Sequence, residues 1–135
     1  MLENPKLNIR IKLSALWTSL MFLYIYGDYF ELYIPNKVDS LLKGTELLDT
    51  PTKLFIASVS LAIPAAMISL NIFLKPGILK YLNITFGILF TITVVLVGSY
   101  SLTPWYSGYA FYAGLEAITT LLIVKLAWNW PKLKS

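Results

Sequence analysis

The sequence contains no cysteine and no histidine among its 135 residues. This excludes disulfides, thiol redox chemistry, zinc sites built from Cys or His, iron–sulfur clusters and His-ligated haem. A metal site would have to use carboxylate and carbonyl oxygens alone, so we expect no metal and no cofactor. Without His, Cys or a nucleophile–base pair, we also expect no catalytic residues, and an enzyme acting on lipid or quinone is the function that we favour least.

Charged residues are also scarce. Asp, Glu, Lys and Arg make up 13% of the chain, and hydrophobic residues make up 57%, whereas soluble domains have about 25% charged and about 45–50% apolar residues. With a mean hydropathy of +0.68, this composition predicts an integral membrane protein in contact with a lipid bilayer. Basic residues flank the apolar segments and do not interleave with aromatics in a patch, so we expect no nucleic acid partner.

Four apolar segments are long enough to cross a bilayer, because about 20 helical residues span its hydrocarbon core. These segments cover residues 11–34, 51–74, 78–101 and 104–130. Thr-Pro pairs at 50–51 and 103–104 are typical helix starts, and Pro64 predicts a kink. We therefore predict an all-α, single-domain fold over residues 1–135, a four-helix transmembrane bundle. The polar stretch 35–50 is expected to hold a short interfacial helix.

Basic residues gather on one side of the predicted bundle. If four helices alternate in direction, this side holds Lys6, Arg10, Lys12, Lys75, Lys80, Lys125, Lys132 and Lys134. On the other side, lysines are offset by Asp39, Glu46 and Asp49. The positive-inside rule then predicts that both termini are cytoplasmic and that the 35–50 loop lies outside.

Three acidic residues lie inside the apolar segments, where carboxylates are rare because desolvating them is costly. Asp28 and Glu31 belong to the aromatic-rich stretch Tyr24–Tyr33 (YIYGDYFELY), and Glu116 lies near the middle of the last segment. No Lys or Arg lies at matching depth, so we expect these acids to lack a salt-bridge partner. Three solutions stay open: protonation, hydrogen bonds from tyrosine hydroxyls, or neutralisation of a bound cation.

A spacing of 3.5 residues groups these acids with aromatic side chains on one face of each helix. The stripe of the first segment is Ser14, Trp17, Met21, Tyr24, Asp28 and Glu31, and that of the last is Trp105, Tyr109, Tyr112, Glu116, Thr119 and Ile123. The middle segments have the stripes Ser60, Pro64, Met67 and Asn71, and Gly87, Thr91, Val94, Gly98 and Ser101. Together they predict an outward-opening polar cavity, closed inward by Trp17, Met21, Met67 and Ile123.

We expect this cavity to bind or transport a small cationic or protonated ligand. Asp28 and Glu116 would carry the charge, Glu31 would lie at the mouth, and the walls would be Tyr24, Tyr109, Tyr112, Trp17 and Trp105. Plainer interpretations stay open: a solvated Glu31, acids that bond across helix contacts, and tyrosines that only pack. The alternative function is a non-catalytic accessory or structural subunit of a larger membrane complex. Because four helices enclose only a narrow axis, we also expect a homo-oligomer.

The stretch IKLSALWTSLMFLYIYGDYFELYIP, followed by LLDTPTKLF and later TPW, resembles a family of small bacterial four-span membrane proteins of unknown function. The matching positions are Ser14, Trp17, Gly27, Asp28, Tyr29, Glu31, Pro51, Pro104 and Trp105. The resemblance covers nearly the whole chain and implies a multi-pass protein of the bacterial inner (plasma) membrane. More distantly, the size and four-span plan resemble the DoxX-like group, some members of which are linked to quinone or thiosulfate oxidation. For the accessory-subunit alternative, this implies a respiratory complex.

Overall fold

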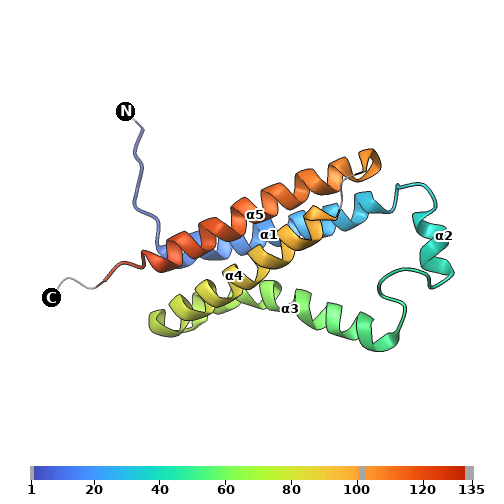
Figure 1. Ribbon diagram of the computed structural model, residues 1–135. Helices are drawn as coiled ribbons and strands as arrows, with labels where there is room; N and C mark the ends of the chain where they lie inside the picture. Colours follow the sequence, from blue (N-terminus) through green and yellow to red (C-terminus); the bar gives the residue numbers. More distant parts are fainter. Residues whose placement is uncertain (1, 101–102, 133–135) are drawn as a thin grey trace.

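The computed structural model describes residues 2–100 and 103–132, and this part of the chain is all-helical (Figure 1). The long helices are α1 (Ile9–Glu31), α3 (Pro51–Phe73), α4 (Pro76–Ser99) and α5 (Ser107–Trp128). The short ones are α2 (Lys37–Leu42) and the 3-10 turn η1 (Pro104–Tyr106). The N-terminal segment and the end of α5 lie at the same end of the bundle, and α2 lies at the other (Figure 1).

Three helices in the described part of the chain are long and apolar enough to cross a membrane. They are α3, α4 and the stretch Pro104–Trp128 formed by η1 and α5. Helix α1 has 23 residues but is not among them, because charged residues near both of its ends lower its hydropathy. The prediction of an all-helical membrane protein is confirmed, although three helices meet the requirements of a span where the sequence predicts four.

Local sequence sets where the helices begin. Thr50 caps α3, since its hydroxyl accepts from the Lys53 N–H at 3.2 Å, as predicted. At Thr103 no side-chain cap forms, and the chain passes through η1 before α5 begins at Ser107. Helix α4 begins at Pro76, earlier than predicted, because proline suits the first helical position. The short helix expected within residues 35–50 is confirmed as α2.

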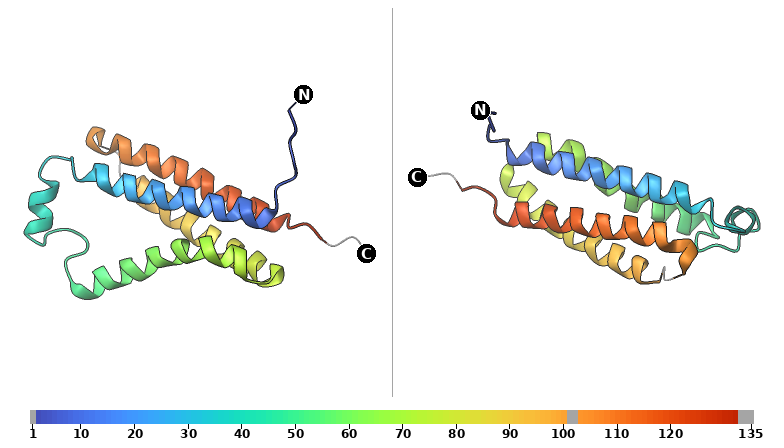
Figure 2. Two further views of the ribbon diagram at one scale, coloured as in Figure 1. Left: turned by 180° about the vertical axis from the view of Figure 1, so that it is seen from behind. Right: turned by 90° about the horizontal axis from the view of Figure 1, so that it is seen from above.

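Helix α3 bends near its middle (Figure 2), where Pro64 interrupts the helical hydrogen bonding. Its buried residues, Pro64, Met67 and Asn71, all lie in the second half. In the first half, residues 51–62 are exposed except for the half-buried Ala57. The kink predicted at Pro64 is therefore confirmed, and it carries the first half of α3 away from the bundle.

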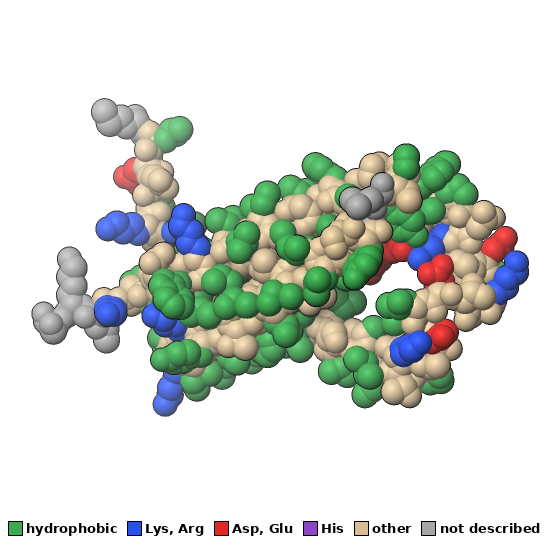
Figure 3. Space-filling view, viewed as in Figure 1, with side chains coloured by type: hydrophobic (Ala, Val, Ile, Leu, Met, Phe, Trp, Pro, Cys, Tyr) green, Lys and Arg blue, Asp and Glu red, His purple; other side chains and the backbone are tan. Residues whose placement is uncertain are grey.

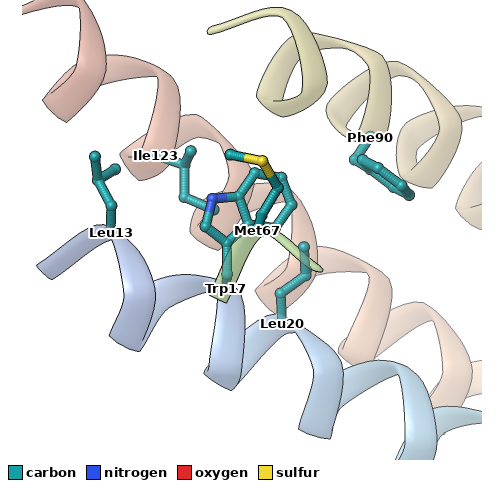
Figure 4. Packing of buried hydrophobic residues seen from close by; sticks show 6 residues of the cluster. All are labelled: Leu13, Trp17, Leu20, Met67, Phe90 and Ile123. Atoms are coloured by element: carbon teal, nitrogen blue, oxygen red, sulfur yellow. The ribbon is translucent and has the colours of Figure 1, made fainter. Parts of the chain in front are cut away.

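The other long helices pack closely, with α5 between α1 and α4 and with α1 also against α3. The core cluster is shown in Figure 4 and consists of Leu13, Trp17, Leu20, Met67, Phe90 and Ile123. Gly87 allows α4 and α5 to approach, because a Cβ there would lie only 2.6 Å from Val124 Cγ2. Of the residues expected to close the cavity, Met21 is only half-buried. Ser101 and Lys134 lie outside the described residues.

Candidate ligand-binding site

Glu116 is the one buried acid in the described part of the chain, with 8% of its surface exposed. It faces α1, since its Oε1 atom lies 3.8 Å from the position that a Cβ on Gly27 would occupy. Because Gly27 has no side chain, the carboxyl lies close to α1 at the residue next to Asp28. No side chain among residues 2–100 and 103–132 forms a hydrogen bond or ion pair with this carboxyl.

A cavity of about 320 Å³ lies beside these acids, where the first half of α3 diverges from the other helices. Its lining comprises Tyr24 and Asp28 from α1, Ala57, Ser60 and Leu61 from α3, Phe90, Thr93, Val94 and Val97 from α4, and Tyr109 from α5. Tyr24, Asp28 and Tyr109 thus meet on one cavity. Glu116 does not line it but is close enough for its charge to interact with Asp28 and Tyr24.

The hydroxyl of Tyr24 is buried and has no hydrogen-bond partner among the described residues. The Tyr24 ring packs against Phe90, with 6.2 Å between ring centroids. Buried polar atoms nearly always have a partner, so each exception calls for a specific explanation. Tyr24 also lines the cavity and lies near enough to Glu116 for the two groups to interact, a setting in which a bound molecule or water can supply a missing bond.

Glu31 has an ion-pair partner that the sequence analysis does not predict. Lys37 Nζ lies 2.7 Å from Glu31 Oε1 and 2.8 Å from Glu46 Oε2. The expectation that all three acids lack a salt-bridge partner is therefore wrong for Glu31. The reason is that the chain turns back after α1 and brings α2 over the end of that helix. Figure 3 shows acidic and basic side chains at the opening between the α2 segment and the bundle.

This ion-pair cluster is electrostatically stable in the folded loop. Burial opposes the charge on Lys37, but hydrogen bonds to Glu31 and Glu46 outweigh it and raise the Lys37 pKa above its ordinary value. The hydrogen bonds that Lys37 and Ser40 donate to Glu46 lower the pKa of that carboxyl. Lys37 is therefore committed to these two partners, and Asp28 has no ion pair among the described residues.

Residues 4–135 match a family of unknown function, DUF6326. The chain belongs to this family. No curated protein and no solved structure matches it. The predicted resemblance to a family of unknown function is confirmed in that respect, and the family assigns no activity to the site.

Three predicted wall residues of this DUF6326 member do not line the cavity. Trp17 is fully buried in the core, and its indole N–H donates to Asn83 Oδ1 at 2.7 Å. Trp105 lies in η1 with 67% of its surface exposed. Tyr112 stacks on Phe30, with 6.3 Å between ring centroids and 25° between planes. Phe90, which the sequence analysis does not include, is an aromatic residue that does line the cavity.

A buried chain of polar side chains in this protein is not predicted from the sequence. Asn83 accepts from Trp17 and donates to Asn71 Oδ1 at 2.7 Å, and Asn71 in turn donates to the Met67 carbonyl at 2.7 Å. All three side chains are fully buried. The available signal was Asn83 itself, an amide inside an apolar segment that lies on the same helical face as Gly87, Phe90 and Val94.

The chemistry open to the site follows from these groups. No cluster of three or more His, Cys, Asp or Glu side chains suited to a metal ion occurs within the described residues. Asp28 and Glu116 offer negative charge, Tyr24 and Tyr109 offer hydroxyl donors, and Phe90 adds an aromatic face. Such a set holds a cation or a proton more readily than it holds an anion.

Proposed function

We propose that this protein binds a small cationic or protonated ligand in the cavity beside Tyr24, Asp28 and Tyr109. Transport of that ligand across the membrane is the wider form of this proposal. In this proposal α1 is a fourth span, since it has the length of one and runs alongside α3 and α5 (Figure 2). Both termini lie on the cytoplasmic side of a bacterial inner membrane. The gathering of basic residues at the end where the termini lie supports this orientation.

The observation that carries the proposal is the buried Tyr24 hydroxyl without a partner. The residue Tyr24 lines the same cavity as Asp28 and lies close enough to Glu116 for the two groups to interact. An unsatisfied buried hydroxyl costs about 1–3 kcal/mol. If this cavity wall served packing alone, we would expect either a hydrogen-bond partner for the hydroxyl or an apolar side chain in its place. A ligand donating or accepting one hydrogen bond at this point removes that cost.

The charge of the expected ligand follows from the two carboxyls. Asp28 lacks a cationic partner among the described residues, and Lys37 is occupied by Glu31 and Glu46. Two neighbouring carboxyls without a counterion favour either a bound cation or shared protons. The volume of about 320 Å³ lies at the lower end for ligand pockets, which start at about 300 Å³, so the ligand is small.

The test is isothermal titration calorimetry of the purified protein in lipid nanodiscs with benzyltrimethylammonium, a small aromatic quaternary cation. Asp28→Asn and Glu116→Gln should each weaken binding by about tenfold or more, since a charge interaction at partial burial is worth about 1–4 kcal/mol. Asp39→Asn removes an equal charge from exposed α2 and serves as the matched control. Neopentylbenzene, a neutral molecule of the same shape, should bind more weakly than the cation.

Equal affinity in all four proteins, or equal affinity for the cation and its neutral counterpart, would remove this proposal. A loss in Asp39→Asn as large as that in Asp28→Asn would also contradict it, because the effect would then reflect total charge and not the cavity.

A further inference from the structure

A second cavity, of about 470 Å³, lies at the end of the bundle where the two chain ends meet. Three separate parts of the sequence build it: the start of α1, the start of α4, and the segment that follows α5. The residues that matter here are Arg10, Pro76, Gly77, Lys80, Trp130 and Lys132. The cavity is far in sequence from Asp28 and Glu116 and shares no lining residue with the site described above.

All of the charged side chains that line this cavity are positively charged. Arg10, Lys80 and Lys132 line it, and no acidic residue does. The same end of the molecule carries further basic side chains, visible in Figure 3, and Lys12 and Lys125 line an adjoining cavity of about 220 Å³. Three cations around one cavity repel each other, and an anion bound among them would offset this repulsion.

Arg10 is held in place by the end of α3. Its guanidinium donates to the Leu74 carbonyl at 2.6 Å and to the Ile72 carbonyl at 3.3 Å. A guanidinium has five N–H donors in a fixed plane, so these bonds position the group and leave donors for a ligand. No carboxylate pairs with Arg10, Lys80 or Lys132 among the described residues.

The start of α4 adds backbone donors to the same cavity. Pro76 occupies the first helical position, and the preceding Lys75 provides no side-chain cap. The first helical hydrogen bond from this turn is that of Leu79 to Lys75, so the N–H groups of Gly77 and Ile78 have no helical acceptor. The space around Gly77 is open, with nothing within 4 Å of where a Cβ would lie. The partial positive charge of a 24-residue helix is directed at this point.

We propose that this cavity binds a phosphate group, and that its source is the headgroup of an anionic phospholipid. Cationic side chains and free amide groups at a helix start are the usual donors to phosphate. Ile9, Pro131 and the ring of Trp130 supply apolar lining, which suits the glycerol and upper acyl region of a lipid. Tryptophan is enriched at the membrane interface, and basic pockets between helices on the cytoplasmic side bind such headgroups.

The test is native mass spectrometry of the detergent-solubilised protein with phosphatidylglycerol and phosphatidylcholine of the same acyl chains. The wild-type protein should retain phosphatidylglycerol preferentially. The double variant Lys80→Gln and Lys132→Gln should weaken phosphatidylglycerol binding by about thirtyfold, from two interfacial lysines, and leave phosphatidylcholine binding unchanged. The matched control is Lys6→Gln with Lys43→Gln, which removes the same charge from exposed positions outside the cavity.

A charge-preserving double variant, Lys80→Arg with Lys132→Arg, should keep the lipid preference, which separates loss of the site from loss of the fold. Inorganic phosphate, titrated by calorimetry into lipid-free protein, tests the other source. Binding of free phosphate that the Lys80→Gln, Lys132→Gln variant loses, without any lipid preference, would overturn the lipid assignment and retain the phosphate site. An unchanged lipid preference in that variant, or an equal loss in the control, would overturn the proposal.

Discussion

Two polar networks cross the interior of this bundle, and they differ in whether their hydrogen bonds are satisfied. Near the end where the termini lie, Trp17, Asn83 and Asn71 form a chain in which each donor has an acceptor. Toward the α2 end, the Tyr24 hydroxyl and the Glu116 carboxyl are buried or nearly so and lack such partners among the described residues. Helix α1 contributes to both, so it belongs to one network that is complete and to one that is open.

The difference separates stability from binding. A buried network in which every member is bonded fixes helix register and resists change. A buried group left without a bond weakens the fold unless another molecule completes it. We therefore expect substitutions in the Trp17–Asn83–Asn71 network to affect the free energy of unfolding. Substitutions that remove the unpaired Tyr24 hydroxyl or the Glu116 charge should weaken binding without lowering the free energy of unfolding.

The largest effect should come from Asn83→Ala. This change leaves the Trp17 indole N–H and the side-chain Oδ1 of Asn71 without a partner, at a cost of about 2–4 kcal/mol in the free energy of unfolding. Thermal unfolding in one detergent, followed by circular dichroism, measures it. Asn129→Ala is the control, because the exposed Asn129 makes the same bond to the carbonyl four residues back. Equal melting temperatures for the two variants would contradict a stabilising network.

A smaller effect separates two substitutions to Phe, each of which removes one polar group. Trp17→Phe removes the donor to Asn83 and part of a fully buried ring, so it should lower the free energy of unfolding by at least about 1–2 kcal/mol. Tyr24→Phe removes a buried hydroxyl that has no partner, so in ligand-free protein it should raise the free energy of unfolding by up to about 1–3 kcal/mol while weakening binding of the cation. The same thermal experiment measures both. If Tyr24→Phe destabilised the protein as much as Trp17→Phe, the Tyr24 hydroxyl would have a protein partner and the contrast would fail.

The smallest effect concerns the loop that holds α2. The Glu46 pKa lies below its ordinary value of 4.5 because Lys37 and Ser40 hydrogen bond to the carboxylate. A carboxyl with a lowered folded pKa stabilises the fold above that ordinary value and loses this contribution as the pH falls through the folded value. Hydrogen exchange of the amides of residues 37–46, corrected for intrinsic rates, should therefore increase between about pH 5 and pH 3.

Glu46→Gln should show this faster exchange already at neutral pH, with little further change on acidification. Asp39→Asn, which removes an acid from α2 without an ion pair, should behave as the wild type. Protection of the loop that stays constant down to pH 3 in the wild type would mean that the Lys37 cluster does not hold it.

Sequence patterns predicted the helices well because long apolar segments and proline positions act locally. The kink at Pro64 and the cap at Thr50 depend only on neighbouring residues, and both are found. The side chains around the cavity were predicted less completely, because they depend on how the helices rotate against each other. The stripe through Trp17 and Tyr24 puts both on one face, yet the core takes Trp17 and the cavity takes Tyr24.

The remaining errors arise from contacts between distant parts of the chain. The sequence analysis extends the first helix as a straight span to residue 34, which would keep Lys37 far from Glu31. In the structure α1 ends at Glu31 and the chain turns back, so the two side chains form an ion pair. The Asn83–Asn71 hydrogen bond joins α4 to α3. It depends on how these two helices are aligned with each other across the tight turn that links them. Periodicity within one helix carries no information on such register, so neither contact follows from the sequence alone.

The bend of α3 at Pro64 bears on how a ligand would reach the cavity. The first half of α3 forms one wall and is the least packed part of the long helices, with residues 51–62 almost entirely exposed. In a bilayer, acyl chains and not water would surround that wall. A ligand entering there in its neutral, deprotonated form would first dissolve in the hydrocarbon phase, so its occupancy would follow the partition coefficient of that form more closely than its aqueous concentration.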